Sequence, residues 1–169
     1  MKLHIGGEEK KEGWKILNIQ KADEVDFVGD ISNLDQFGDN SFEEIYASHV
    51  IEHVDQKNIK KTLKGINRIL ENNGKFYISV PDLDVLCRIF INEKAPLKAK
   101  FHVMQMMFGG QVDKYDYHYF GWNYELLNSY LLDAGFKKNE KVKTFNLFND
   151  FSNFAPYGPL ISLNVIAYK

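Results

Sequence analysis

Short apolar runs recur through the first half of the chain, separated by polar and glycine-containing stretches. The runs are continuous and rich in β-branched and aromatic residues, which is typical of parallel strands buried on both faces of a sheet. The pattern predicts strands at Leu3–Ile5, Lys15–Ile19, Val25–Val28, Glu44–Ser48 and Lys75–Val80.

Between the fourth and fifth predicted strands the apolar positions change to helical spacing, from Ile59 to Leu70. Asp55 can cap the start of this helix, and Gly74 stands where a left-handed residue would end it. A strand, a helix and a second strand in succession predict an α/β fold.

The second half of the chain has a different pattern. A helix is predicted over Asn123–Ala134, ending at Gly135, and strands are predicted near Lys141–Phe148 and Ile161–Ala167. Residues 86–122 are rich in aromatic residues and methionine and show no strand period. We expect this segment to be an insertion or lid.

A stripe at helical spacing lies inside that segment. Phe101, Met104 and Met107 or Phe108 would share one face of a helix. Such a stripe is more often core, or the underside of a lid, than a cofactor site.

Composition narrows the classes of protein. With 169 residues, 44% of them hydrophobic, the chain can bury one core, so we expect a single domain over residues 1–169. The 21 Lys and Arg residues are scattered and balanced by 23 Asp and Glu residues, which argues against nucleic-acid binding. The single cysteine excludes an internal disulfide. No apolar run reaches the ~20 residues of a membrane span and no signal-peptide pattern is found, so we expect a cytoplasmic protein.

The opening stretch "KLHIGGEEKKEGWKILNIQ" has two interpretations. Gly6 and Gly7 follow the first strand as in a nucleotide-binding turn, but Trp14 begins the next apolar run too soon for a crossover helix. Either the first two strands form a hairpin without a ligand, or a cofactor-binding fold has lost its first helix.

Polar residues follow several predicted strands at the positions where an open parallel sheet binds its ligand. Gln20 follows the second strand, Asp30 lies just after the third, and Ser48 and His49 lie at the end of the fourth and directly after it. Glycine, a carboxylate and a polar cluster would suit a cofactor that contains a nucleoside. Asp30 has an alternative role as a simple turn carboxylate, since Ser32 follows it closely.

The stretches "DFVGDIS", "YASHVIEHV" and "NGKFYISVPD" resemble class I S-adenosylmethionine-dependent methyltransferases, specifically the small kind found beside bacterial polysaccharide-biosynthesis genes. The resemblance implies a Rossmann-like sheet, mostly parallel with an antiparallel last strand, in which the first helix is reduced or missing. It also implies S-adenosylmethionine as the cofactor and a small-molecule or glycan acceptor. The reduced cofactor fold is therefore favoured over the hairpin.

The same resemblance assigns the cofactor-binding residues. Gly6 and Gly7 would lie under the methionine moiety, which Ser48 and His49 would flank. Asp30 would face the adenine amino group, with the backbone of Ile31 beside it.

Gln20 departs from the family pattern, because the resemblance implies a ribose-binding acid at this place. An amide can still bond a ribose hydroxyl, but it loses the stronger charge-assisted contact.

The acceptor side depends on the segment "DKYDYHYFGW", whose polar and aromatic groups suggest a mobile cover or an acceptor pocket. A hydroxyl acceptor needs a base, and we expect it to be His118 or His53, with Asp116 as a further candidate. The aromatic groups would suit sugar recognition, or equally a contact between subunits in a homo-oligomer.

Two other functions remain open from the residues. The reduced cofactor motif would suit a degenerate methyltransferase fold that acts as a binding or assembly module. His49, His53 and Asp116 would suit a metal-dependent hydrolase. His49 and His53 would share a helix face with Glu52 nearby, but we expect no metal site because no third ligand is evident from the sequence.

Overall fold

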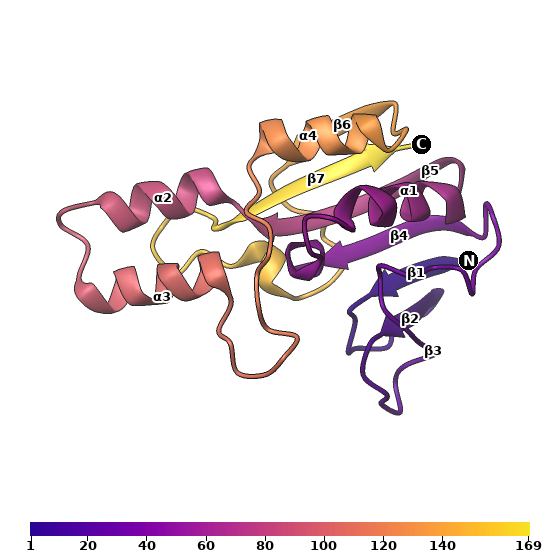
Figure 1. Cartoon of the computed structure of the whole chain (residues 1–169), viewed down its shortest axis with the longest axis horizontal. Helices are drawn as coiled ribbons and strands as arrows, with labels where there is room; N and C mark the ends of the chain where they lie inside the picture. The colour runs from indigo at the N-terminus through magenta and orange to yellow at the C-terminus, as the bar shows by residue number, and fades with distance from the viewer.

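The computed structural model describes residues 1–169 and contains one seven-stranded sheet in the order β3-β2-β1-β4-β5-β7-β6 (Figure 1). β7 runs antiparallel to both of its neighbours, and the other pairs are parallel. The predicted mostly parallel sheet with an antiparallel last strand is therefore confirmed. The strands are β1 (Lys2–Ile5), β2 (Trp14–Asn18), β3 (Phe27–Val28), β4 (Phe42–Ser48), β5 (Leu70–Pro81), β6 (Lys138–Val142) and β7 (Ser162–Tyr168).

The two predicted helices are present and pack next to each other on one face of the sheet (Figure 1). The second ends as expected before Gly135, which adopts a φ of 100°. No helix combines the length and the apolar character needed to cross a bilayer. The helices are α1 (Ile59–Ile69), α2 (Leu83–Ile91), α3 (Leu97–Phe108) and α4 (Tyr124–Asp133), with short 3₁₀ turns η1 (Ile51–His53) and η2 (Phe151–Asn153).

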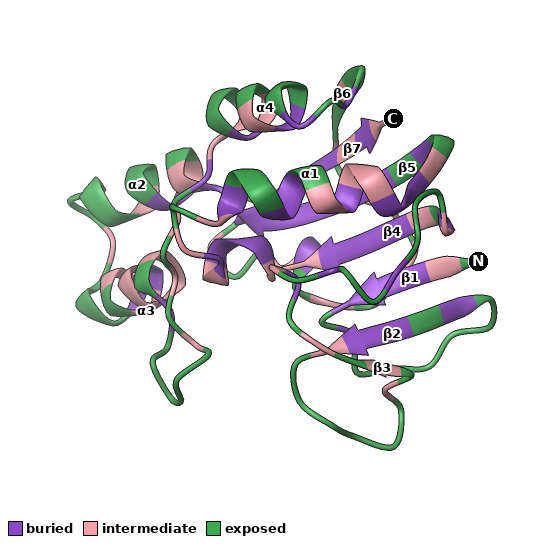
Figure 2. Cartoon of the chain, turned by 45° about the vertical axis from the view of Figure 1, so that its right-hand side comes forward, coloured by how far each residue is buried: buried purple, intermediate pink, exposed green.

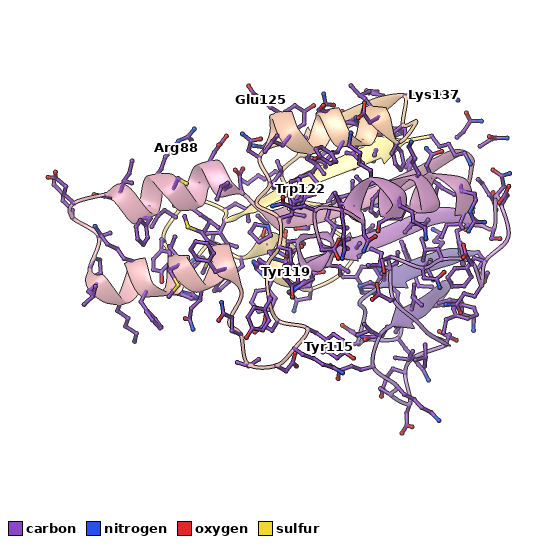
Figure 3. The ribbon with its side chains drawn as sticks, in the orientation of Figure 1. Arg88, Tyr115, Tyr119, Trp122, Glu125 and Lys137 are labelled. Atoms are coloured by element: carbon purple, nitrogen blue, oxygen red, sulfur yellow. The ribbon has the colours of Figure 1, made fainter.

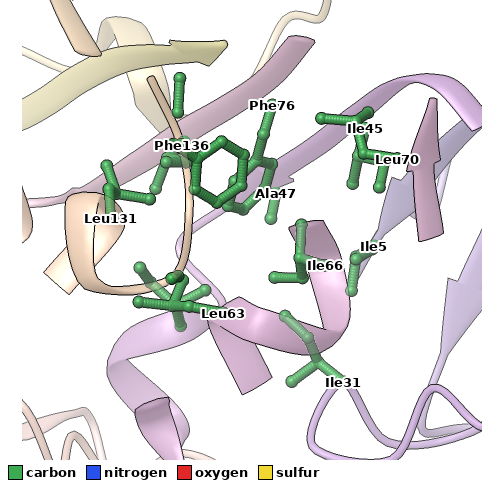
Figure 4. Packing of buried hydrophobic residues seen from close by; sticks show 14 of the residues in the cluster. Ile5, Ile31, Ile45, Ala47, Leu63, Ile66, Leu70, Phe76, Leu131 and Phe136 are labelled. Atoms are coloured by element: carbon green, nitrogen blue, oxygen red, sulfur yellow. The ribbon is translucent and has the colours of Figure 1, made fainter. Parts of the chain in front are cut away.

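A core of 27 buried residues joins this face of the sheet to α1 and α4. Figure 2 shows that β1, β4 and β5 are largely buried, whereas α2 and α3 expose much of their surface. Part of the packing is drawn in Figure 4, where Leu63 and Ile66 of α1 and Leu131 of α4 face side chains of the central strands.

The first connection has no helix. β1 and β2 pair in parallel, with Ile5 opposite Leu17, and the Gly6 N–H donates to the Leu17 carbonyl at 2.8 Å. The hairpin interpretation is therefore wrong, and the expectation of a missing first helix is confirmed. The loop of residues 6–13 makes the crossover alone.

The opposite face of the sheet is covered by residues 143–154 instead of by helices. Phe145, Leu147 and Phe148 pack against an aromatic cluster of the strands. That cluster consists of Trp14, Tyr46 and Tyr77.

Two buried polar side chains tie this cover to the sheet. The Tyr46 hydroxyl donates to Asp150 Oδ2 at 2.7 Å. The Asn164 amide donates to the carbonyls of Lys143 and Ser152, at 3.0 and 2.9 Å. The segment therefore has a defined path although it contains little regular structure.

Two sequence predictions about element ends were wrong. The predicted strand Lys141–Phe148 ends at Val142, because the aromatic residues beyond it pack over the sheet instead of extending its ladder. Gly74 does not end α1, since β5 begins directly after the helix. Gly74 lies in a bulge of β5, where an added Cβ would come within 2.9 Å of the Glu43 carbonyl oxygen.

Two helices form most of the first part of the predicted insertion, and the stripe predicted from Phe101 to Phe108 lies in the second of them, α3. α2 and α3 form a hairpin around the small cluster of Leu86, Val103 and Ile161. The stripe is divided, since Phe101 and Phe108 are 58% and 56% exposed, whereas Met107 packs against this cluster. The buried face of α3 is the one that carries Ala99 and Val103, which is rotated around the helix axis from the predicted stripe.

The link between Tyr46 and Asp150 can be tested by Tyr46→Phe. Loss of a hydrogen bond to a charged group commonly costs ~1.5–3 kcal/mol, so we expect the free energy of unfolding in urea to fall by about that amount. Tyr168→Phe is the matched control, because its hydroxyl also bonds a carboxylate, that of Glu140, but at an exposed site. We expect the free energy of unfolding of Tyr168→Phe to fall by less than ~1 kcal/mol. Equal losses in the two variants would contradict an anchoring role for Tyr46.

Candidate functional site

A cavity of about 490 Å³ opens beyond the carboxyl ends of β1, β2 and β4. This is the edge at which open parallel sheets bind their ligands, and the volume is in the range of small-molecule sites. The structure brings six of the seven predicted cofactor-binding residues to its wall. They are Gly6, Gln20, Asp30, Ile31, Ser48 and His49.

Gly6 and Gly7 are each restricted to glycine by a different neighbouring side chain. Gly6 lines the cavity with a φ of 76°, and an added Cβ would lie 2.6 Å from Val50 Cγ2. Gly7 does not line the cavity. A Cβ at Gly7 would instead lie 2.6 Å from the His4 ring on the opposite face of the sheet.

Asp30 forms a turn and also lies on the cavity wall. One carboxylate oxygen accepts from the Ser32 N–H at 2.8 Å, which makes a tight turn after β3. The residue also lines the cavity, next to Ile31, which continues into the core. The turn fixes where the carboxylate lies relative to the cavity.

Asn18 is a cavity residue that the sequence analysis missed. It is the last residue of β2, and its amide donates to the Gly7 carbonyl and accepts from the Gln20 N–H. The predicted strand ends one residue later, at Ile19, which makes Gln20 the first polar residue after it. The side-chain amides of Asn18 and Gln20 both line the cavity. The Asn18 amide is also fixed by its hydrogen bond to the Gly7 carbonyl.

His49 is held in a backbone conformation that is rare for residues other than glycine. Its φ is 54°, and its N–H donates to the Ser79 carbonyl at 2.8 Å. The ring bridges two partners, with Nε2 at 2.9 Å from Ser162 Oγ and Nδ1 at 3.3 Å from Glu52 Oε1. Strained residues of this kind gather at functional sites.

The loop between α3 and α4 closes one side of the cavity. Val112, Asp113, Tyr115 and Asp116 line it, and Figure 3 shows Tyr115 and Tyr119 on this loop. The base of the loop is fixed, because the N–H groups of Tyr119 and Phe120 both donate to the backbone carbonyl of Glu52. The predicted cover therefore forms part of the wall of the cavity at the strand ends.

A second cavity of about 350 Å³ adjoins the first. His49, His53 and Asp116 line both cavities, whereas His118 lines only the second. The three predicted candidates for the base therefore lie at or beside the junction. The other walls include His102, Gln105, Met106, Phe151 and Phe154, which the sequence analysis did not single out.

Glu52 lies fully buried at this junction. Burial acts to raise the pKa of its carboxyl, but contact with the His49 ring and the positive charge of the neighbouring imidazoles lower that pKa overall. Burial lowers the pKa of His118, as does the charge of His53, while the charge of Glu52 opposes both. His118 is therefore poised as a neutral imidazole near pH 7.

Comparison with known proteins identifies the class of this architecture. Residues 9–78 match a family described as a methyltransferase domain, and no curated protein matches the chain. An S-adenosylmethionine-dependent methyltransferase from Archaeoglobus fulgidus is similar in structure, with a TM-score of 0.60 and 15% identity, covering 99% of this chain and 85% of that one. Burkholderia thailandensis 1,6-didemethyltoxoflavin-N1-methyltransferase has a TM-score of 0.62 and 16% identity, covering 99% of this chain and 70% of that one. It was solved with 1,6-didemethyltoxoflavin and S-adenosylhomocysteine.

The fold is that of the Rossmann-like class I methyltransferases. The similar structures include one S-adenosylmethionine-dependent methyltransferase and one solved with S-adenosylhomocysteine, the product form of that cofactor. The cavity fits that cofactor in size, in the close backbone approach that Gly6 permits, and in the carboxylate of Asp30 on its wall. The amides of Asn18 and Gln20 provide hydrogen-bonding groups at the end of β2.

The role of the Asp30 charge can be tested by Asp30→Asn, which keeps an oxygen for the Ser32 N–H. We expect affinity for S-adenosylhomocysteine to fall by at least ~1 kcal/mol, about fivefold, in calorimetric titration, because a charge-assisted hydrogen bond is lost. Asp35→Asn is the control, since Asp35 does not line the cavity. Unchanged affinity in Asp30→Asn would mean that the adenine lies elsewhere.

Proposed function

We propose that this chain transfers the methyl group of S-adenosylmethionine to a hydroxyl of a small polar acceptor, such as a sugar unit of a polysaccharide precursor. The observation that carries this proposal is the shared wall of the two cavities, formed by His49, His53 and Asp116. A donor in one cavity and an acceptor in the other would meet beside groups that can take a proton.

The walls of the second cavity support a polar acceptor with apolar faces. Phe151 and Phe154 offer aromatic surface, and His102 and Gln105 offer hydrogen-bonding groups. The cavity is of the size expected for a small-molecule site. The sequence resemblance also favours an acceptor that belongs to polysaccharide biosynthesis.

When bound, the sulfonium cofactor supplies an electrophilic methyl group. The chain must hold the acceptor hydroxyl in line with that group and receive its proton as the new O–C bond forms. His118 donates from Nδ1 to the Met106 carbonyl, 2.9 Å away, so its Nε2 carries the lone pair that can accept the proton. His53 is held in the same way by the Tyr117 carbonyl and is the second candidate.

A binding or assembly module without catalysis is the second candidate function. It is favoured by the crossover of residues 6–13, which has no helix, and by amides where the family pattern has an acid. Calorimetric titration with S-adenosylhomocysteine separates the two, because a pure assembly module would give no saturable heat.

The catalytic proposal predicts the effect of His118→Asn. With methyl-labelled S-adenosylmethionine and a panel of sugars and nucleotide sugars as acceptors, we expect label transfer to fall by roughly 10²–10⁴-fold. Affinity for S-adenosylhomocysteine should change less than about twofold, because His118 does not line the cofactor cavity. Wild-type turnover in this variant would make His53 the residue to replace next.

A further inference from the structure

Glu52 has a buried carboxylate whose own chain does not satisfy it. Its side chain is 0% exposed, and neither oxygen has an aligned hydrogen-bond partner. The nearest group is His49 Nδ1, at 3.3 Å from Oε1. A buried carboxylate without hydrogen bonds is costly, so its persistence points to a positive partner at this place.

The two histidines beside it present lone pairs. His53 Nδ1 lies 3.1 Å from the Tyr117 carbonyl oxygen, and His118 Nδ1 lies 2.9 Å from that of Met106. A carbonyl oxygen can only accept, so each Nδ1 carries the hydrogen and each neutral ring keeps a lone pair on Nε2. A backbone carbonyl on the other ring nitrogen is the usual support of a histidine that binds metal.

These three groups converge on one point. One ligand atom from each of Glu52, His53 and His118 lies within 4.8 Å of the others, and the two imidazole rings are 4.7 Å apart at their centroids. Bonds of about 2.1 Å to a tetrahedral ion would bring the ligand atoms to about 3.4 Å, which small side-chain rotations can supply. Electron-pair donors that lie this close repel one another unless a proton or a cation lies between them.

We propose that Glu52, His53 and His118 bind one divalent first-row transition-metal ion at the junction of the two cavities. Two imidazoles and one carboxylate suit such an ion and leave coordination positions open. Since His53 and His118 both line the second cavity, those positions would face the acceptor.

The third ligand, His118, was not evident from the sequence because it is distant from η1 along the chain. The loop between α3 and α4 places it beside Glu52 and His53. His53 and Glu52 come from η1, whereas His118 comes from the far end of the loop, which the Glu52 carbonyl holds in place. The metal site is therefore a product of the same backbone contacts that close the cavity.

The site would change how the acceptor is activated, a point that rests on the proposed function. A hydroxyl bound to a divalent ion loses its proton more easily, so the ion would replace a free imidazole in lowering the hydroxyl pKa. The released proton would pass to a base at the junction, for which Asp116 is available on both cavity walls.

Metal binding can be tested without cofactor or acceptor. The full chain is stripped with a chelator and titrated calorimetrically with Zn²⁺ as the probe. We expect about one Zn²⁺ per chain and a rise in the melting temperature. Glu52→Gln, His53→Asn and His118→Asn should each weaken binding by roughly 100-fold or more, since even supporting residues of metal sites are worth 10–100-fold.

His102→Asn is the matched control, because His102 lines the same cavity but bonds the Tyr157 hydroxyl and lies outside the cluster. It should bind Zn²⁺ as the wild type does. Absence of saturable binding, or equal weakening in His102→Asn, would overturn the proposal. If Glu52→Gln does not fold, as judged by circular dichroism, the two histidine variants decide the result.

Activity separates this inference from the proposed function. Methyl transfer that stops on chelation and returns with metal, while S-adenosylhomocysteine still binds, would support a catalytic ion. Transfer at the full rate in chelator would contradict the catalytic part. Saturable Zn²⁺ binding without any methyl transfer would contradict the proposed function and leave the metal site standing.

Discussion

The burial of one carboxylate, that of Glu52, is the constraint on which the site depends. Its backbone carbonyl accepts two N–H groups from the loop between α3 and α4, and its side chain faces three imidazoles. Removing a charge from water costs several kcal/mol unless nearby groups compensate. The fold gathers His49, which follows β4, His53 of η1 and His118 of the loop around this carboxylate, so the position of the loop and the electrostatics of the site are coupled.

The missing first helix has two consequences for the rest of the molecule. The glycine loop of residues 6–13 is left to form the cavity wall by itself, and the Asn18 amide bonds its backbone. The crossover of residues 6–13 also supplies no helix to cover the sheet on the face opposite α1 and α4. Residues 143–154 take that place, held by Tyr46 and by the fully buried Asn164, because the central strands would otherwise expose their aromatic side chains.

The two cavities differ in how their walls are built. The first lies at strand ends, where positions are fixed by the sheet ladder and by tight turns such as that of Asp30. The second lies between η1, α3 and η2, and its walls come from segments far apart in the chain. The shape of the second cavity therefore depends on how the insertion folds, whereas that of the first depends mainly on the sheet, which is the usual division between scaffold and loops.

The family resemblance favoured a fold without its first helix over a hairpin, and the pattern along the chain predicted the α/β class and the strand ends that carry Gly6, Asp30 and His49. These features depend on local periodicity and on the rule that ligands meet parallel strands at their carboxyl ends, both of which can be read along the chain. Tertiary structure alone decided the rest. It placed Phe145 over the sheet instead of in a strand, and it brought His118 next to Glu52. Such contacts join segments that are distant in sequence, and no local pattern encodes which side chains a loop will bring together when it closes on a buried charge.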